Sequence, residues 1–389
     1  MFTFTSKLRN ITFALMAIGV AAVVYGFITN PDRAWAALLQ NNFYFNAIAL
    51  CGLFFVAFQY LAQAGWSAGF VRVPQAMSGF LKFGCAGLLL IFILGHHSLY
   101  HWTHHELFDP ASPEYDKIVA GKAGFLNMPF FIARLVLYGL IWGGFAWMIR
   151  KNSLQEDIEG GLSHYKKNFK LSAIFIVLFG ISSSTSAWDI LMSIDVHWFS
   201  TLFGWYTFAG LFVSGLAMIA MLVMYLKSQG YYDNVSENHL HDLGKFMFAF
   251  TIFWTYLWFS QFMLIWYANL PEEVVYFQFR WEHFKLLWIG NLFINFLAPF
   301  LVLMSRDAKR QRQILITAGV IIICGHWIDV FLMVFPGTIG SAAHIGLVEI
   351  GTGLGYLGAF LFVTFSELTK AALVPKNHPM MAESAHHHI

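Results

Sequence analysis

Ten apolar segments, each close to the length that a bilayer requires, set the strongest limit on how this chain folds. They cover about residues 8–28, 43–64, 77–98, 125–149, 169–191, 202–226, 244–268, 284–304, 312–334 and 345–368. A membrane-spanning helix needs about 20 predominantly apolar residues. The chain is 58% hydrophobic and only 11% charged, whereas a soluble domain carries about 25% charged residues. We therefore predict an all-α integral membrane protein in which residues 1–389 form one polytopic domain of ten transmembrane helices.

The lysines and arginines predict how these helices are oriented, because cytoplasmic loops carry the excess of basic residues. With the N-terminus in the cytoplasm, seventeen of them fall on inner segments and five on outer segments, while Arg134 lies within the fourth span. Both termini are therefore predicted to be cytoplasmic, with an uncleaved first helix and a disordered AHHHI tail. The net charge of only +2 gives no reason to expect a nucleic-acid partner. Membrane lipids are the expected surroundings.

The cysteines predict no redox centre in this chain. Cys51, Cys85 and Cys324 all lie within apolar segments, and an odd number so placed predicts buried free thiols and no disulfide framework or zinc site. The sequence also lacks a CxxCH motif and a ferredoxin-like cysteine run. We therefore expect no covalently bound cofactor, no metal, and neither a c-type haem nor an iron–sulfur cluster.

Ionisable residues inside the spans gather at one predicted depth, below the outer surface. Such groups are costly in a bilayer and are usually paired or functional. Asp189 ends the fifth span, His326 and Asp329 lie three apart in the outer half of the ninth, and Glu349 lies one turn into the tenth. His96 and His97 end the third span at a similar depth. We interpret Asp189, His326, Asp329 and Glu349 as candidate proton relays in one polar layer.

Hydroxyl residues share helical faces with these groups. Ser182, Thr185 and Ser186 lie three to seven residues before Asp189, and hydroxyls can both donate and accept a proton. Tyr256 and Ser260 form a similar pair in the seventh span. With an acid on the same face we favour a proton path or polar pocket; the alternative is helix packing through small hydroxyl residues. Arg134 needs an acidic partner within the membrane, and Asp189 is the first candidate.

Several weaker patterns leave alternatives open. His97, His101 and His105 are four residues apart and would suit a metal, although a solvated rim is the favoured interpretation. His96 or His97 facing His326 would suit a haem b, but Asp329 beside His326 favours proton chemistry. Gly351 and Gly355 form a GxxxG packing motif. Separately, Asn291, Asn295 and Pro299 predict a locally irregular eighth span.

Two longer motifs carry a family resemblance. "SIDVHWFSTLFGWY", residues 193–206, and "WFSQFMLIWYANLPEE", residues 258–273, are followed by Arg280. These residues resemble the ActF-type membrane subunits of bacterial alternative complex III, a quinol:cytochrome c oxidoreductase. Such subunits are similar to the NrfD/PsrC-type quinol-interacting membrane proteins and to the sister subunit ActC. The similarity covers nearly the whole chain, including the ten spans.

The resemblance implies an architecture and a set of partners. It implies two four-helix bundles, helices two to five and six to nine, flanked by helices one and ten, in a bacterial inner membrane. It implies menaquinol, or menaquinone, as the substrate of the assembly. The implied partners are the sister NrfD-like subunit ActC and the iron–sulfur and multihaem cytochrome c subunits, which hold the clusters and haems; a terminal oxidase is a further candidate. By position in the motifs it adds Asp195, His197, Glu272, Glu273 and Arg280 to the candidate residues.

Taken together, the sequence predicts a membrane subunit of a quinol-oxidising electron-transport complex. Within the respiratory chain it is expected to contribute a quinone-site-like pocket, a proton pathway near the outer face, or both, without a redox metal of its own. The alternatives are a scaffold that only anchors the complex, and a secondary transporter, since polar residues within spans also mark solute paths.

Overall fold

The computed structural model describes residues 1–388, and within that range it contains helices and no strand. Ten of its helical segments are long and apolar enough to cross a membrane, so the chain is a multi-pass integral membrane protein, as predicted. The spanning elements are α1 (Ser6–Thr29), α2 (Pro31–Leu61), α3 with α4 (Arg72–Met77, Leu81–Leu99), α6 (Met128–Glu159), α7 (Ser163–Ile190), α8 (Phe203–Ser228), α9 (Glu237–Ala268), α10 with α11 (Pro271–Leu292, Ala298–Val302), α12 (Arg312–Thr338) and α13 (Leu347–Leu368).

Local sequence explains where several helices begin, and why some are longer than their apolar segments. The Asn30 side chain accepts a hydrogen bond from the Arg33 amide, and Pro31 occupies the first turn of α2. Asn127 and Pro129 begin α6 in the same way. Proline and an asparagine cap both favour a helix start. The charged first turn of α2 hides this start from a hydropathy reading, which places it at about residue 43.

The helices form the two predicted four-helix bundles. In the first bundle each helix packs on the next in the closed order α2, α4, α6, α7. The second bundle is closed in the same way by α8, α9, the α10–α11 segment and α12. Helix α13 packs on α2, and α1 packs on α13. Helices α2, α8 and α12 are the most buried spans and form the interface between the bundles. The core of the protein therefore lies along these three helices.

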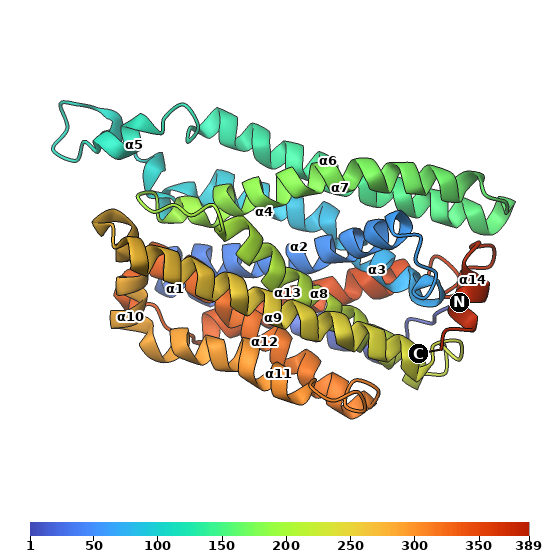
Figure 1. Ribbon diagram of the computed structural model, residues 1–389. Coiled ribbons are helices and arrows are strands. Elements are labelled where there is room, and N and C mark those ends of the chain that lie inside the picture. Colours follow the sequence, from blue (N-terminus) through green and yellow to red (C-terminus); the bar gives the residue numbers. More distant parts are fainter. Residues whose placement is uncertain (389) are drawn as a thin grey trace.

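Figure 1 shows that both termini lie at the same end of the molecule. We call this the terminal end; it is the end predicted to face the cytoplasm. The opposite end, here called the far end, holds the short helix α5 (Lys117–Gly121) and the start of α10. The first part of α10 runs across the far end and the chain then turns along the bundle, close to Phe284, whose backbone is not helical (φ −125°, ψ 22°).

Glycines allow α1 and α13 to touch backbone to backbone. A methyl group added at Gly355 would lie 2.6 Å from the Gly19 Cα, and one added at Gly351 would lie 2.4 Å from the Ala22 Cβ. Only 17% of the apolar window of α1 is buried, so this helix depends on a narrow contact. The GxxxG motif is thus a packing motif, as expected.

We expect Gly355→Ala to lower the unfolding temperature of the purified protein in detergent. The new methyl group must displace backbone, which costs about 1–3 kcal/mol in a packed interface. Gly144→Ala is the matched control, because no described residue lies within 4 Å of a methyl group at that position in α6. The control should be neutral or slightly stabilising, since alanine favours a helix more than glycine does. Equal unfolding temperatures for both variants would contradict this description of the α1–α13 contact.

The C-terminal tail packs on the terminal end, which corrects the expectation of a disordered segment. The Ser384 hydroxyl donates to the Trp66 carbonyl (3.0 Å) and accepts from the Gly69 amide (3.1 Å). His387 Nε2 lies 2.6 Å from Asp242 Oδ2. His378 is only 8% exposed. Polar side chains of the tail therefore satisfy backbone groups that the helix ends leave free, a pattern that composition alone does not reveal. Ile389, the last residue of AHHHI, lies outside the described residues.

The tail is expected to loosen in mild acid. Burial lowers the pKa of His378 from its ordinary 6.5 to about 4, so the folded tail binds the proton less readily than the released tail. The contribution of neutral His378 to the stability of the packed tail is then complete above pH 6.5, and it falls as the pH drops from 6.5 toward about 4. Limited proteolysis of the tail should accelerate over that interval, and His378→Phe should reduce the acceleration. A cleavage rate that does not change with pH in the wild type would contradict this role.

Candidate functional site

The buried carboxyl groups predicted to share one polar layer lie in three separate networks. Asp189, Asp329 and Glu349 are each at most 3% exposed, but they share no hydrogen-bond or ion-pair partner among residues 1–388. Depth along a helix is readable from the sequence, whereas the direction in which a side chain points is set by packing. The predicted polar layer is therefore not one connected network of side chains.

Asp189 is held by a full set of donors within the first bundle. Arg134 Nε and Nη2 donate to its two oxygens at 2.8 and 3.0 Å, and the Tyr138 hydroxyl donates at 2.6 Å. The guanidinium stacks on Phe125 and Phe130, 3.9 and 4.3 Å from the ring centres. The predicted pairing of Arg134 with Asp189 is confirmed. A carboxylate bound in this way is well suited to hold α6 against α7.

Within the described residues, the hydroxyl groups before Asp189 bond mainly to their own surroundings, and only Thr185 also interacts with the Tyr138 hydroxyl that donates to Asp189. Ser182 accepts a hydrogen bond from the Trp142 indole at 3.0 Å, whereas Thr185 and Ser186 donate to carbonyls of their own helix. These contacts favour the packing alternative for the serines. Ser186 does border a small cavity of about 40 Å³ between the bundles, together with Asn46 and Thr207.

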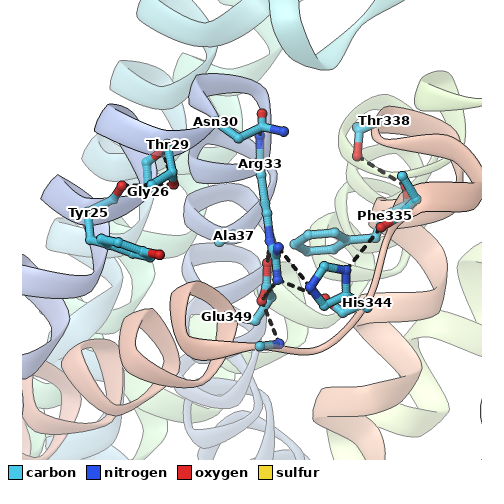
Figure 2. A network of polar contacts seen from close by, with 12 residues as sticks. Tyr25, Gly26, Thr29, Asn30, Arg33, Ala37, Phe335, Thr338, His344 and Glu349 are labelled. Carbon is cyan, nitrogen blue, oxygen red and sulfur yellow. Dashed lines mark hydrogen bonds and ion pairs between the residues drawn. The ribbon is translucent and has the colours of Figure 1, made fainter.

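Glu349 is also bound by an arginine, at the junction of α2, α12 and α13 (Figure 2). Arg33 Nε and Nη2 donate to its oxygens at 2.6 and 2.7 Å, and the Gly346 amide donates to it at 2.8 Å. Arg33 also lies 3.0 Å from His344 Nε2. This network closes the start of α13 onto the start of α2 at the far end.

Asp329 differs because, among residues 1–388, none of its hydrogen-bond donors is a cation. The Tyr206 hydroxyl and Asn291 Nδ2 donate to Oδ1 at 2.5 and 2.7 Å, and Trp254 Nε1 donates to Oδ2 at 3.2 Å. His326 Nδ1 lies 3.8 Å from Oδ2. Neither His326 nitrogen has a hydrogen-bond partner within the described part of the chain. A buried acid beside an unsatisfied imidazole is the arrangement with the clearest capacity to take up and pass a proton.

A small cavity leads from Asp329 toward the far end. It measures about 20 Å³, and Asp329, Asn291, Tyr206, Gln261, Tyr276 and Arg280 are among the residues that line it. This volume is enough for about one water molecule. Tyr276 and Arg280 also line a larger pocket of about 330 Å³ at the far end. Tyr276 and Arg280 thus border both the small cavity at the buried acid and the open pocket.

Arg280 is placed in that position by a proline in α12. Pro336 has no amide hydrogen, so the carbonyl of Leu332, four residues earlier, loses its helical donor. Arg280 Nε donates to that carbonyl at 3.1 Å, while Nη2 donates to Asp195 Oδ2 at 3.1 Å. The guanidinium also lies 3.3 Å from the centre of the Tyr276 ring. The arginine therefore joins α10, α12 and the segment after α7 at the mouth of the cavity.

The predicted irregularity of the eighth span is confirmed and orients the floor of the site. Residues Phe293–Leu297 form a π-helical turn between α10 and α11. Asn295 Nδ2 donates to Asn291 Oδ1, and Asn291 in turn donates to Asp329. Gly325 provides the room, since a methyl group there would lie 2.2 Å from Asn295 Oδ1. Single π-helical turns are frequent at functional sites.

The far-end pocket contains several residues of the two sequence motifs. Asp195, His197 and Glu272 line it together with His101. His197 Nε2 lies 2.6 Å from Asp116 Oδ2, which ties the loop before α6 to the segment after α7. Burial, and then the neighbouring His104 and His197, lower the pKa of His101 below its ordinary value. Glu273 is half-buried at the start of α10 and does not line this pocket.

Four candidates do not join the site. His96 is half-buried and bonds the Ile93 carbonyl, and His97 is exposed and stacks on His104. Tyr256 is 63% exposed and Ser260 is half-buried, so their face of α9 turns outward. In residues 1–388 no group of three or more His, Cys, Asp or Glu side chains is arranged to hold a metal ion, and this includes the His97–His105 stretch.

The inward-facing polar residues of the second bundle were not predicted from the sequence. Trp254 and Gln261 contribute the inner face of α9, and Tyr206 and Tyr276 complete the surroundings of the acid. Tyr206 closes the first sequence motif, which is the only signal that pointed to it. Aromatic residues are so frequent in this chain that a single one carries little information.

Comparison with known proteins adds no family assignment. The chain matches no protein-family model, and no curated protein matches it significantly. The fold and the site therefore define it as a multi-pass α-helical membrane protein with a buried acid–imidazole pair below a far-end pocket.

Proposed function

We propose that the chain is a membrane subunit of a quinol:cytochrome c oxidoreductase of the alternative complex III type, and that Asp329 and His326 exchange protons with the far end. One observation supports this proposal above the others. Asp329 has no cationic hydrogen-bond donor in the described part of the chain, and it borders a water-sized cavity that shares Tyr276 and Arg280 with an open pocket. The resemblance of residues 193–206 and 258–273 to ActF-type subunits supplies the class of complex.

The chemistry of quinol oxidation gives this site its role. Each quinol releases two protons, and each proton needs a base within about 3 Å or one water away. In the proposal Asp329 accepts a proton, His326 stabilises or shares it at Nδ1, and water in the cavity passes it to the pocket beside Asp195 and His197. Arg280 fixes the wall of this route through its hydrogen bond to the Leu332 carbonyl. Haem and iron–sulfur chemistry belongs to partner subunits.

A scaffold role is the second candidate, and the arginine pairs favour it. Asp189 and Glu349 are each bound bidentately by an arginine, which suits structural fixation better than proton transfer. In this role the chain anchors redox subunits, and Asp329 only holds neighbouring helices together. The two candidate functions predict the same partners. They differ in whether replacing Asp329 lowers the turnover of the complex.

The class of complex is tested by purification from native membranes. We expect this chain, carrying a tag at its N-terminus, to bring down haem-stained cytochrome c subunits together with quinol:cytochrome c oxidoreductase activity. A secondary transporter would purify alone and without haem. That result would refute the proposed function, because no partner subunit would be present to take electrons from the quinol.

A further inference from the structure

A second group of buried polar residues lies at the terminal end, on the opposite side of the molecule from Asp329. Its residues are Gln59 and Tyr60 near the end of α2, Arg72 in α3, Glu156 near the end of α6, and His378 in the tail. All five are less than 9% exposed. None of them belongs to the proposed route at the far end.

Several polar atoms of this group have no partner within the described residues. They are both amide atoms of Gln59, the Tyr60 hydroxyl, Arg72 Nε and Glu156 Oε1. Leaving such an atom buried and unsatisfied costs about 1–3 kcal/mol, and in proteins ordered water usually satisfies these atoms. Gln59 and Tyr60 line a cavity of about 10 Å³, which is close to the volume needed to hold one water molecule.

Unlike the neighbouring Asp157, Glu156 has no cationic partner among the residues that the structure describes. Arg72 donates to Asp157 Oδ2 at 2.6 Å and to the side chain and carbonyl of Ser153. Within residues 1–388, Glu156 makes no ion pair, although it is only 1% exposed. A buried carboxyl without a paired cation favours its neutral, protonated form. The charged and titratable groups around it are Arg72, Asp157, His164, Tyr60 and Tyr165.

The C-terminal tail covers the cavity. His378 lines it together with Gln59, and its ring centre lies 5.8 Å from that of Tyr60 and 5.6 Å from that of Tyr165. The Asp157 side chain accepts from the Lys376 amide at 2.8 Å, which fixes the tail over α6. The tail therefore stands between the cavity and the solvent at the terminal end.

We propose that Glu156 is a proton-exchange site: a neutral carboxylic acid that passes its proton to water held by Gln59 and Tyr60, and so to the terminal end beneath His378. The proton returns by the same path, and no other bond changes. The exchange itself does not depend on the proposed function. Only the idea that this exchange supplies protons for transfer across the membrane rests on the proposed function.

Infrared spectroscopy of the intact purified protein tests this site. We expect a carboxylic-acid band that is absent in Glu156→Gln and that shifts when the wild type is transferred into deuterated water. Glu159→Gln, an exposed acid one turn away, is the matched control and should retain the band. An unchanged spectrum in Glu156→Gln, or a band that does not shift, would overturn the proposal. Neither result depends on turnover, so the proposed function is not tested by it.

Radiolytic footprinting gives an independent measure of the water. Hydroxyl radicals formed from bound water should label Tyr60 several-fold faster than Tyr44, which is equally buried but donates to the Ile323 carbonyl at 2.7 Å. His378→Ala should accelerate deuterium exchange at Glu156, because it removes the cover. Equal labelling of the two tyrosines would show a dry pocket and overturn the proposal, and an unchanged exchange rate would overturn the path beneath His378.

Discussion

Asp329→Asn is expected to lower quinol:cytochrome c turnover of the assembled complex by at least about 100-fold, the lower end of what a positioned proton acceptor contributes. Asparagine keeps the size of the side chain and can still accept the hydrogen bond from Tyr206. It cannot take up a proton at neutral pH. The complex should therefore assemble with its normal haem content while turnover fails.

Asp242→Asn is the control for this variant. Asp242 is a similarly buried aspartate, 7% exposed, but it lies at the terminal end and pairs with Lys245 and His387. Turnover should be close to that of the wild type in this control. A normal rate in Asp329→Asn would remove Asp329 from the mechanism and leave the scaffold role as the better candidate.

Arg134→Met is expected to destabilise the protein strongly. It leaves the Asp189 carboxylate buried without its cation, which costs about 3–5 kcal/mol when one partner of a buried pair is removed. The Tyr138 hydroxyl alone does not replace two guanidinium bonds. The unfolding temperature in detergent and the yield from membranes should both fall.

The double variant Arg134→Met with Asp189→Leu separates charge from packing. Replacing both members of a buried pair by apolar residues is often neutral or stabilising, so most of the lost stability should return. If the double variant is as unstable as Arg134→Met, the pair is not the cause. Normal turnover in the rescued protein would place Asp189 outside the proton chemistry, whereas continued loss would support its predicted role as a relay.

Much of the fold follows from the sequence, because a bilayer leaves the backbone few choices. Apolar length predicts the ten spans, and the positions of Asn291, Asn295 and Pro299 predict the irregular span. The start of α2 is missed since Asp32 and Arg33 interrupt the apolar pattern, although the Asn30 cap and Pro31 continue the helix. The packed tail is missed because its contacts are individual polar bonds, such as those of Ser384.

The site is less predictable, for a geometric reason. Position along a helix gives the depth of Asp189, Asp329 and Glu349, but their rotation about the helix axis decides which bundle they face. The Arg134–Asp189 pair was predictable because a buried cation requires an acid. The Tyr256–Ser260 pair marks one face of α9, yet the structure turns that face outward and Trp254 inward. Hydroxyl spacing identifies a face without fixing its direction.

The most direct test of the central claim is a redox-triggered infrared difference spectrum of the purified complex, recorded as quinol reduces it. If Asp329 exchanges protons during turnover, the spectrum contains a carboxyl signal that is absent in Asp329→Asn and retained in Asp242→Asn. Identical difference spectra for the wild type and Asp329→Asn would contradict the claim.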